Sequence, residues 1–431
     1  MAKKILLIDP PFQKFMNFSK GGIPLGLLSL AGSLKNRGHE VDVLDSDYNP
    51  HGESYPFIAK IDHYKNYLDG LKDEGHPIWE GIKNQISESS PDIVGLSLIS
   101  TKVKSGLRTA EIAKRLGVKY VFAGGPHVTI SPESVSQYKN IDGLLTGEGE
   151  NQFEELFLTD RVNATTIKKL DDLPISDRSS LVGIEGYVKE DLGYVMTARG
   201  CINDCNFCCS DVLWGRGVRK RNIDNVIKEI DSVNSNYGTT NFYVADDTFT
   251  LSKKRVMEFG DRMKERGYSW SCLTRLDRIN EGMIDHMKNS GCHMVKVGVE
   301  SGNERVLESM NKGVNLQTIR ESSKLLNNAG MPWLAYFMAG SPGETSSDLS
   351  DTMKFIGEIN PTYVSSAIYT PYPGTGFAKN HVISGDFALE EMNHHSLETI
   401  AGDIPREKLR EFMEFSDKYN DSRKAREMFS K

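Results

Sequence analysis

The 431-residue sequence predicts an α/β protein, with a doubly wound parallel sheet followed by a six-unit partial (β/α) barrel. Short apolar runs alternate with helical patterns twice, once before residue 160 and again from residue 194. Such alternation is typical of parallel sheets covered by helices. We therefore predict a first domain over residues 1–160, a linker over 161–193, a barrel over 194–385 and a short C-terminal helical region over 386–431.

The first domain contains five predicted buried strands, at residues 4–9, 39–44, 92–98, 120–123 and 141–146. Helices are predicted over residues 25–37 and 105–116. The more polar and aromatic segment 51–90 is interpreted as a helical insertion. Ligands of doubly wound sheets bind at the carboxyl ends of the strands, so we expect a binding site there.

Six further strands are predicted in the barrel, at residues 194–197, 241–245, 270–274, 294–299, 333–338 and 364–369. The helices between them have candidate caps, which support the assignment. The N-caps are Asn222, Ser252, Asn280, Asn315 and Thr345, and two glycines, Gly291 and Gly330, follow C-termini. In barrels of this kind the chemistry lies on the loops after the strands.

Charge and hydropathy exclude several kinds of protein. The net charge of −7 and the pI near 5.9 argue against a broad nucleic-acid interface, which needs a basic face. No apolar run reaches about 18 residues, so no membrane span is expected. The first ten residues read as a strand and are too short for a secretory signal. We expect a cytoplasmic protein that acts on a small molecule.

The cysteines indicate a metal cluster. None of the six precedes Cys201, and four lie within residues 201–209. Cys201, Cys205 and Cys208 have the spacing C-x3-C-x2-C on the loop after the first barrel strand. Three thiolates can hold one face of a [4Fe–4S] cubane and leave one iron open, whereas most electron-transfer clusters have four. The amino and carboxylate groups of S-adenosylmethionine (SAM) can chelate an open iron, and an electron from the cluster can then cleave its sulfonium bond.

Other interpretations of these cysteines stay open. A tetrahedral zinc site needs a fourth ligand at matching spacing, and no second C-x2-C or histidine pair follows. A disulfide framework would spread its cysteines through a small secreted domain. Cys209 adjoins Cys208, which makes it a poor ligand for the same cubane. Cys272 and Cys292 are expected to pack as small apolar residues.

The sequence closely resembles the radical SAM superfamily, through the cysteine motif with Phe207 before its last cysteine. It resembles the branch that joins a Rossmann-like, cobalamin-binding N-terminal domain to the barrel, which includes methyltransferases and the anaerobic porphyrin ester cyclase. The resemblance covers about residues 1–380. Its further motifs are Ala245-Asp246-Asp247-Thr248-Phe249 in place of Gly-Gly-Glu, residues 270–277, Gly298-Val299-Glu300-Ser301-Gly302, Gly340-Ser341-Pro342-Gly343-Glu344-Thr345 and residues 369–375.

This resemblance implies a SAM site made of Phe207, Asp246, Asp247, Arg275, Glu300, Ser301, Gly340 and Tyr369. Phe207 would lie beside the adenine, and Glu300 would bind the ribose unless it caps a helix. Arg275 suits a bidentate grip on the SAM carboxylate, and the alternative is an ion pair with Asp277 or Asp246. Adjacent side chains on a strand point opposite ways, so one of Asp246 and Asp247 should face outward.

Two segments have competing interpretations. The turn 340–344 either brings backbone amides close to the adenine or is a plain tight turn. The basic run 214–221 either meets an anionic substrate or shields the cluster as a solvated loop.

A corrin needs a floor of small residues and a slot for its nucleotide tail. Candidates at strand ends are Ser97, Ser100, Thr101, Gly124, Gly125, His127, Gly147 and Glu148. The first strand–helix loop lacks the cobalt-binding histidine of the Asp-x-His-x-x-Gly motif, so we expect cobalt without a protein histidine, and His127 nearer the tail than the metal. The alternative is a degenerate domain that binds no corrin.

The leading hypothesis is a cobalamin-dependent radical C-methyltransferase. It would cleave SAM to a 5′-deoxyadenosyl radical and methylate an unactivated carbon, with electrons from an external donor such as flavodoxin or ferredoxin. The alternatives are a cobalamin-dependent cyclase or rearrangement enzyme without methyl transfer, and a radical SAM enzyme whose first domain has lost cobalamin. A non-catalytic sensor would not cleave SAM. A methylthiotransferase would need cysteines before Cys201, and there are none.

Overall fold

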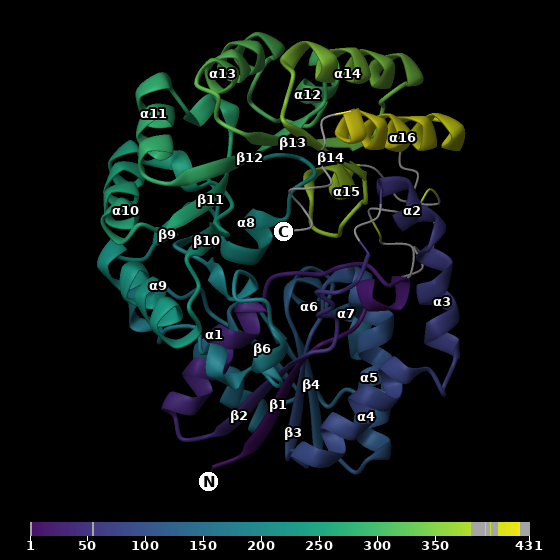
Figure 1. The fold of residues 1–431 in the computed structure, drawn as a ribbon. Coiled ribbons are helices and arrows are strands. Elements are labelled where there is room, and N and C mark those ends of the chain that lie inside the picture. The colour runs from purple at the N-terminus through teal and green to yellow at the C-terminus, as the bar shows by residue number, and fades with distance from the viewer. Residues whose placement is uncertain (1, 54–55, 381–392, 394–396, 398–403, 423–431) are drawn as a thin grey trace.

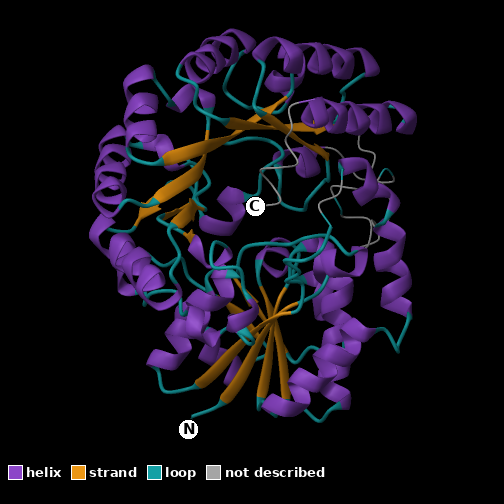
Figure 2. Cartoon of the chain, viewed as in Figure 1, coloured by secondary structure: helices purple, strands orange, loops and turns teal. Residues whose placement is uncertain are grey.

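Two parallel sheets, one above the other, form the framework of the molecule (Figure 1). The computed structural model describes residues 2–53, 56–380, 393, 397 and 404–422. Helices lie on both faces of the lower sheet and on the outer, convex side of the upper one (Figure 2). The α/β class and the two-sheet organisation expected from the sequence are confirmed.

The N-terminal sheet is parallel in every pairing. Its strand order is β2-β1-β3-β4-β5-β6. These strands are β1 (Lys4–Asp9), β2 (Glu40–Asp45), β3 (Ile93–Ser97), β4 (Tyr120–Gly124), β5 (Gly143–Thr146) and β6 (Arg161–Asn163). The helices around it are α1 (Leu25–Asn36), α2 (Phe57–Asp62), α3 (Tyr64–Lys72), α4 (Pro77–Ser89), α5 (Val103–Arg115), α6 (Pro126–Ile130) and α7 (Glu133–Ser136).

Alternation along β1 shows how this sheet is covered on two faces. Ile5 and Leu7 pack into the cluster that contains α1, whereas Leu6 and Ile8 pack into the cluster that contains α4 and α5. Successive strand side chains point to opposite faces, so a continuous apolar run serves both layers. This is the doubly wound arrangement that the apolar runs predict.

The segment predicted as a linker is an ordered, packed part of the structure. Its first residues form β6, which extends the N-terminal sheet beside β5. Further along, Leu181 forms a bridge with Val43, and the buried Arg178 donates to the carboxylate of Glu229. The three-residue strand β6 is too short to be recognised by periodicity, which is why the sequence interpretation missed it.

The second sheet is a partial barrel in the order β14-β13-β12-β11-β10-β7, again parallel. Its strands are β7 (Tyr194–Val195), β10 (Asn241–Val244), β11 (Ser269–Thr274), β12 (Cys292–Glu300), β13 (Trp333–Ala339) and β14 (Tyr363–Ile368). The outer helices are α9 (Ile223–Tyr237), α10 (Lys253–Arg266), α11 (Glu281–Asn289), α12 (Glu304–Ser309), α13 (Leu316–Asn328) and α14 (Ser346–Ile359). The six predicted strands are confirmed, although β7 ends two residues early.

The predicted helix caps are also confirmed as cap positions. Asn222, Asn280, Asn315 and Thr345 each accept a backbone N–H of the first turn, and Thr345 forms a capping box. Ser252 is the N-cap of α10 without a side-chain bond. These caps fix where each helix begins, and so fix the length of the loops that follow the strands.

The C-terminal helix α16 (Arg406–Ser422) closes the side of the barrel. It packs on β14 through a hydrogen bond between Ser416 and Ser366, 2.6 Å long. Asp417 accepts the backbone N–H groups that begin α2, which ties the helical insertion to the end of the chain. The predicted boundary between residues 385 and 386 lies outside the described residues.

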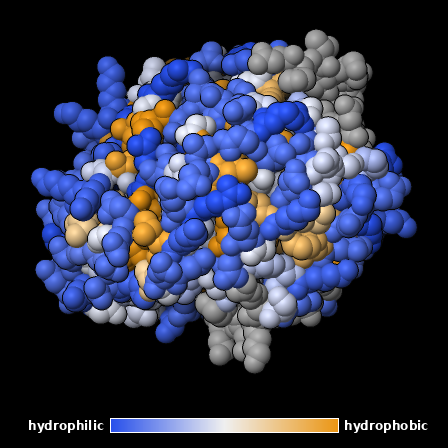
Figure 3. Space-filling model, turned by 90° about the horizontal axis from the view of Figure 1, so that it is seen from above, coloured by the Kyte–Doolittle hydropathy of each residue, from blue (hydrophilic) through white to orange (hydrophobic). Residues whose placement is uncertain are grey.

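The surface above the barrel is mostly hydrophilic, and its hydrophobic residues gather in several separate groups (Figure 3). Within the described part of the chain, every helix is too short or too polar to cross a bilayer.

Candidate active site

The three cysteines of the motif lie on the loop that leaves β7. A short antiparallel pair, β8 (Ala198–Arg199) and β9 (Arg219–Lys220), holds the two ends of this loop together, and α8 (Ser210–Trp214) lies within it. Each motif sulfur has a polar group within reach. Asn203 donates to Cys201 over 3.2 Å, Arg275 lies 3.9 Å from Cys205, and the backbone N–H of Ser210 donates to Cys208 over 3.4 Å.

This surrounding fits a thiolate-bound cluster. N–H groups directed at the sulfurs of an iron–sulfur cluster stabilise its negative charge and tune its potential. Burial raises the pKa of Cys205, and raises that of Cys208 to about 12. Iron binds thiolates, so assembly of the cluster must displace the protons of these thiols.

Two neighbouring carboxylates brace the cluster loop. Asp246 is buried and accepts the backbone N–H groups of Thr197 and Ala198, at 2.6 and 3.0 Å. Asp247 accepts the hydroxyl of Ser210 at 2.7 Å, on the far side of the cysteines. Burial raises the pKa of Asp246 to about 6, against the opposing effect of these hydrogen bonds. Both residues follow the end of β10 at Val244, and their side chains diverge: Asp246 is turned toward the loop backbone and Asp247 toward Ser210.

Arg275, Glu300 and Lys312 form a charged group beside Cys205. Arg275 pairs with Asp277 at 2.8 Å and donates to the backbone carbonyl of Lys312 at 2.7 Å, so the predicted alternative of an ion pair is realised. Lys312 pairs with Glu300 at 2.8 Å and lies 5.7 Å from the ring centre of Phe207. Three of the residues predicted for SAM, Phe207, Arg275 and Glu300, thus lie around one point beside Cys205.

The backbone at Glu300 is in the left-handed region, with φ +71°. A register shift interrupts the pairing of β12 and β13 at this residue. A side chain at Gly298 would meet the carboxylate of Glu300 at 2.3 Å, so the glycine leaves room for the Glu300–Lys312 pair in this position. Strained backbone of this kind persists where the surrounding structure fixes it, often at functional sites.

The remaining predicted SAM residues do not all point toward the group formed by Phe207, Arg275 and Glu300. Ser301 bonds to Thr352 of α14 at 3.2 Å, so its side chain faces the helix layer. Gly340 has φ +85°, and its N–H and that of Ser341 donate to Glu344. Burial raises the pKa of Glu344 to about 7. Tyr369 packs in one cluster with Phe207 and stacks edge-on against Phe377.

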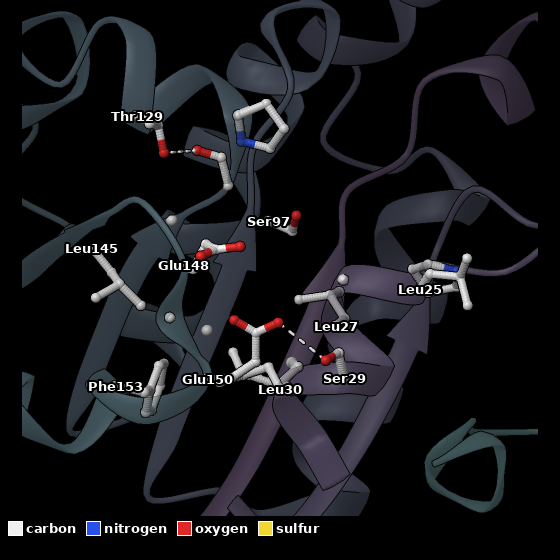
Figure 4. Close-up of a pocket in the computed structure, with 18 of the residues that line it drawn as sticks. Leu25, Leu27, Ser29, Leu30, Ser97, Thr129, Leu145, Glu148, Glu150 and Phe153 are labelled. Atoms are coloured by element: carbon white, nitrogen blue, oxygen red, sulfur yellow. Dashed lines mark hydrogen bonds between the residues drawn. The ribbon is translucent and has the colours of Figure 1, made fainter. Parts of the chain in front are cut away.

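A pocket of about 500 Å³ opens at the carboxyl ends of the N-terminal strands. Its deep part is apolar and lies between α1 and the strands, with Leu27, Leu145 and Phe153 pointing into it (Figure 4). A side chain at Gly95 would meet Leu7 at 2.7 Å, so small residues keep this slot open. An apolar slot under a floor of glycines is what a corrin with a nucleotide tail requires.

The predicted cobalamin residues divide into two groups. The described lining of the pocket includes Ser97, Gly124, Gly125, Gly147 and Glu148. It does not include Ser100, Thr101 or His127. His127 is fully buried between the hydroxyls of Ser100 and Ser134, each 2.8 Å away, and burial lowers its pKa to about 4. A neutral histidine satisfied on both nitrogens is a structural residue here, contrary to its predicted role near the tail.

Ion pairs lie at the pocket edge, on and beside the loop that lacks the histidine. Lys20 pairs with Asp9 and Asp45, each at 2.9 Å, and Lys102 pairs with Asp9 at 2.7 Å. Despite burial, the two lysines hold the pKa of Asp9 low. Sequence reasoning missed both lysines, although the position of Lys20 before Gly21 and Gly22 is a recognisable loop signal.

One wall of the pocket comes from the barrel. Arg199, two residues before Cys201, and Trp214 of α8 line it together with Met196. The guanidinium of Arg199 lies 5.2 Å from the Trp214 ring and pairs with Glu148 at 2.8 Å and Glu150 at 2.5 Å. Figure 4 shows Glu150 also bonded to Ser29 of α1. The basic run predicted to begin at Trp214 therefore belongs partly to this wall, since Arg219 also pairs with Glu148.

Comparison with known proteins agrees with this geometry. The Radical SAM superfamily matches residues 195–356, and the B12 binding domain matches residues 17–157. An uncharacterised methyltransferase of Pyrococcus horikoshii is 31% identical over 402 residues, which cover 86% of this chain and 82% of the relative. Cytidylyl-2-hydroxyethylphosphonate methyltransferase of Streptomyces wedmorensis is 25% identical over 456 residues, which cover 90% and 83%.

Among solved structures, the radical S-adenosylmethionine methyltransferase TsrM from Kitasatospora setae, which holds cobalamin and a [4Fe–4S] cluster, shares this fold. Its TM-score is 0.68 at 18% identity, over 88% of this chain and 74% of that one. The protein is therefore a radical SAM enzyme of the family that joins a B12-binding domain to the barrel, with a [4Fe–4S] cluster, SAM and cobalamin as its cofactors.

Proposed function

We propose that this enzyme is a cobalamin-dependent radical methyltransferase that acts on an unactivated carbon of a small molecule. The observation that carries the proposal is the shared wall: Arg199 and Trp214, on the stem of the cluster loop, also line the strand-end pocket of the N-terminal domain. Cofactors held by these two sites are neighbours, which methyl transfer between them needs. The methyltransferase relatives support the same chemistry.

We assign the cofactor contacts as follows. Cys201, Cys205 and Cys208 hold the cluster. Phe207, Glu300 and Lys312 surround SAM, and Arg275 acts from beside Cys205. Asp246 and Asp247 position the loop without touching SAM. The corrin rests on Ser97, Gly124, Gly125 and Gly147, with its tail in the apolar slot.

The residues have separate tasks in this scheme. With SAM bound, the cluster supplies a 5′-deoxyadenosyl radical that removes a hydrogen atom from the substrate, and cobalamin carries the methyl group. Asp246 and Asp247 fix both ends of the cysteine loop, and Arg199 fixes that loop against Glu148 and Glu150. The Trp214 ring covers the pocket on the barrel side and limits the entry of water.

The products of SAM test this proposal. The chain would be reconstituted anaerobically with iron, sulfide and hydroxocobalamin, then reduced and given SAM with a trideuterated methyl group. We expect both 5′-deoxyadenosine and S-adenosylhomocysteine, the second of which forms only when the methyl group leaves SAM. 5′-Deoxyadenosine alone would indicate the cyclase or rearrangement alternative. The absence of both products would indicate a non-catalytic protein.

We also propose an external one-electron donor of the flavodoxin or ferredoxin kind and a cytoplasmic location, with no nucleic-acid partner. No two of the six cysteines form a disulfide, which accords with a reducing compartment.

A further inference from the structure

The inner face of the barrel carries a lysine that the cofactors do not use. Lys296 lies near the middle of β12, in register with Leu273 of β11 and Leu334 of β13. Register partners in a parallel sheet point to the same side, and the neighbours Val295 and Val297 pack outward under the helices. Lys296 therefore faces inward, opposite the helix layer seen in Figure 2.

Three tyrosines share this inner face. Tyr194 and Tyr243 are register partners whose ring centres lie 5.0 Å apart. The ammonium of Lys296 lies 3.9 Å from the centre of the Tyr243 ring. Tyr336 pairs in register with Gly298, two residues beyond Lys296, so it faces the same side. Burial raises the pKa of all three phenols, so at neutral pH each is a hydrogen-bond donor.

Lys296 makes no ion pair with any residue that the structure describes. The cations near the two cofactor sites are paired: Lys312 with Glu300, Lys102 with Asp9 and Arg199 with two glutamates. Lys296 is only half-buried, and a ring face compensates its partly desolvated ammonium less than a carboxylate does. The described residues therefore leave this site without a negative charge.

The position of Lys296 separates it from the SAM contacts. Glu300 is four residues further along the same strand, which corresponds to about 13 Å. The SAM carboxylate, held near Cys205 and Arg275, cannot supply the missing charge from that distance. Across the sheet, Tyr243 of β10 and Tyr194 of β7 lie on the side of Lys296 that is nearer to Met196, which lines the cobalamin pocket.

We propose that Lys296, with Tyr194, Tyr243 and Tyr336, binds an oxyanion of the substrate, so that the substrate is a small molecule carrying a carboxylate or a phosphate. This inference names the substrate class of the proposed methyltransferase and rests on that proposed function. The ammonium supplies the charge, and the phenol hydroxyls donate to the same oxygens. Anchoring this end leaves the rest of the molecule to extend toward the cofactors.

Chemical labelling of Lys296 tests the proposal without turnover. The reconstituted holoenzyme with SAM would be treated with a low dose of acetic anhydride, and acetylation of each lysine would be measured by peptide mass spectrometry. Benzoate and inorganic phosphate are the anionic probes, and neutral benzamide is the matched control. We expect either anion to slow acetylation of Lys296 severalfold and to leave the exposed Lys264 unchanged. A stronger effect of benzoate assigns a carboxylate, and a stronger effect of phosphate assigns a phosphate ester.

Protection by neither anion, or equal protection by benzamide, would overturn the inference. The readout does not depend on methyl transfer, so failure of the two proposals can be told apart. If S-adenosylhomocysteine never forms but benzoate protects Lys296, the anion site stands and the methyltransferase proposal fails. If S-adenosylhomocysteine forms but neither anion protects Lys296, the anion site is wrong and the methyltransferase proposal stands.

The charge itself can be separated from side-chain length. We expect K296M, which keeps the side-chain length but not the charge, to lose benzoate binding, measured by calorimetry. K296R should retain binding within severalfold. Equal benzoate binding by K296M and the wild-type holoenzyme would contradict the proposal.

Discussion

Cys208 and Cys209 are adjacent residues with different environments. The sulfur of Cys208 accepts the N–H of Ser210, whereas Cys209 begins α8, with its carbonyl accepting the N–H groups of Val212 and Leu213. We expect C208A to lose most of its iron and all 5′-deoxyadenosine formation, because an iron ligand is removed. C209A, the matched control, should keep both, measured by iron assay and chromatography. Iron loss in C209A equal to that in C208A would place Cys209 in the cluster site.

Glu344 gives the fold a pH dependence. Its folded pKa of about 7 lies above the ordinary 4.5, so between these pH values the folded state binds more protons than the unfolded state. The free energy of unfolding therefore falls as pH rises through this window. We expect E344Q to remove up to about 3 kcal/mol of this dependence. Urea unfolding at pH 5 and pH 8 checks it, and an unchanged pH profile in E344Q would contradict it.

Individual residues show what the sequence can and cannot predict. The cysteines, Phe207, Arg275 and Glu300 could be identified because a motif or a strand end marks each one. The turn of Ser301 toward α14 depends on a hydroxyl partner, Thr352, that no spacing predicts. Lys312 was missed because its partner Glu300 is twelve residues away, across a helix and a turn.

Helix α1 shows how one element forms the cofactor slot. Gly26 lines the pocket, and a Cβ there meets no atom within 4 Å. We expect G26F to occupy the slot and lose bound corrin, measured by absorbance after gel filtration, with iron content unchanged. The matched control is G357F on α14, where a Cβ is equally unobstructed. Normal corrin content in G26F would show that the corrin binds elsewhere.

At the scale of elements, continuous apolar runs predicted the strands well because parallel strands are buried on both faces. The exceptions are short. β6 has three residues, and α6 and α7 are single turns that follow Gly125. Such elements are held by their neighbours in the fold, so their own sequences contain too little periodicity to predict them.

The two domains are joined through buried ion pairs on the stem of the cluster loop. Arg199 is nearly buried against Glu148 and Glu150, while Arg216, on the same loop, pairs with Asp204 in solvent. We expect R199M to lower the free energy of unfolding by about 3–5 kcal/mol, because Glu150 is left buried without its cation and Glu148 keeps only Arg219. R216M should cost less than about 1 kcal/mol. Chemical denaturation measures both, and equal effects would refute the buried role.

The relative placement of the domains was the least predictable feature. Each half could be inferred from its own pattern, but the contacts of Arg178 and Arg199 join residues about 50 positions apart across two sheets. No local rule selects those partners, because both arginines look like ordinary loop cations in the sequence.

The shared wall also links vitamin supply to the integrity of the chain. A corrin seated between α1 and Trp214 would contact both halves at once, so it would bind the folded chain and not the unfolded one. The free energy of unfolding should then rise with the logarithm of the free corrin concentration, once that concentration exceeds the dissociation constant. Chains made during vitamin shortage would be the first that proteases cut between the halves.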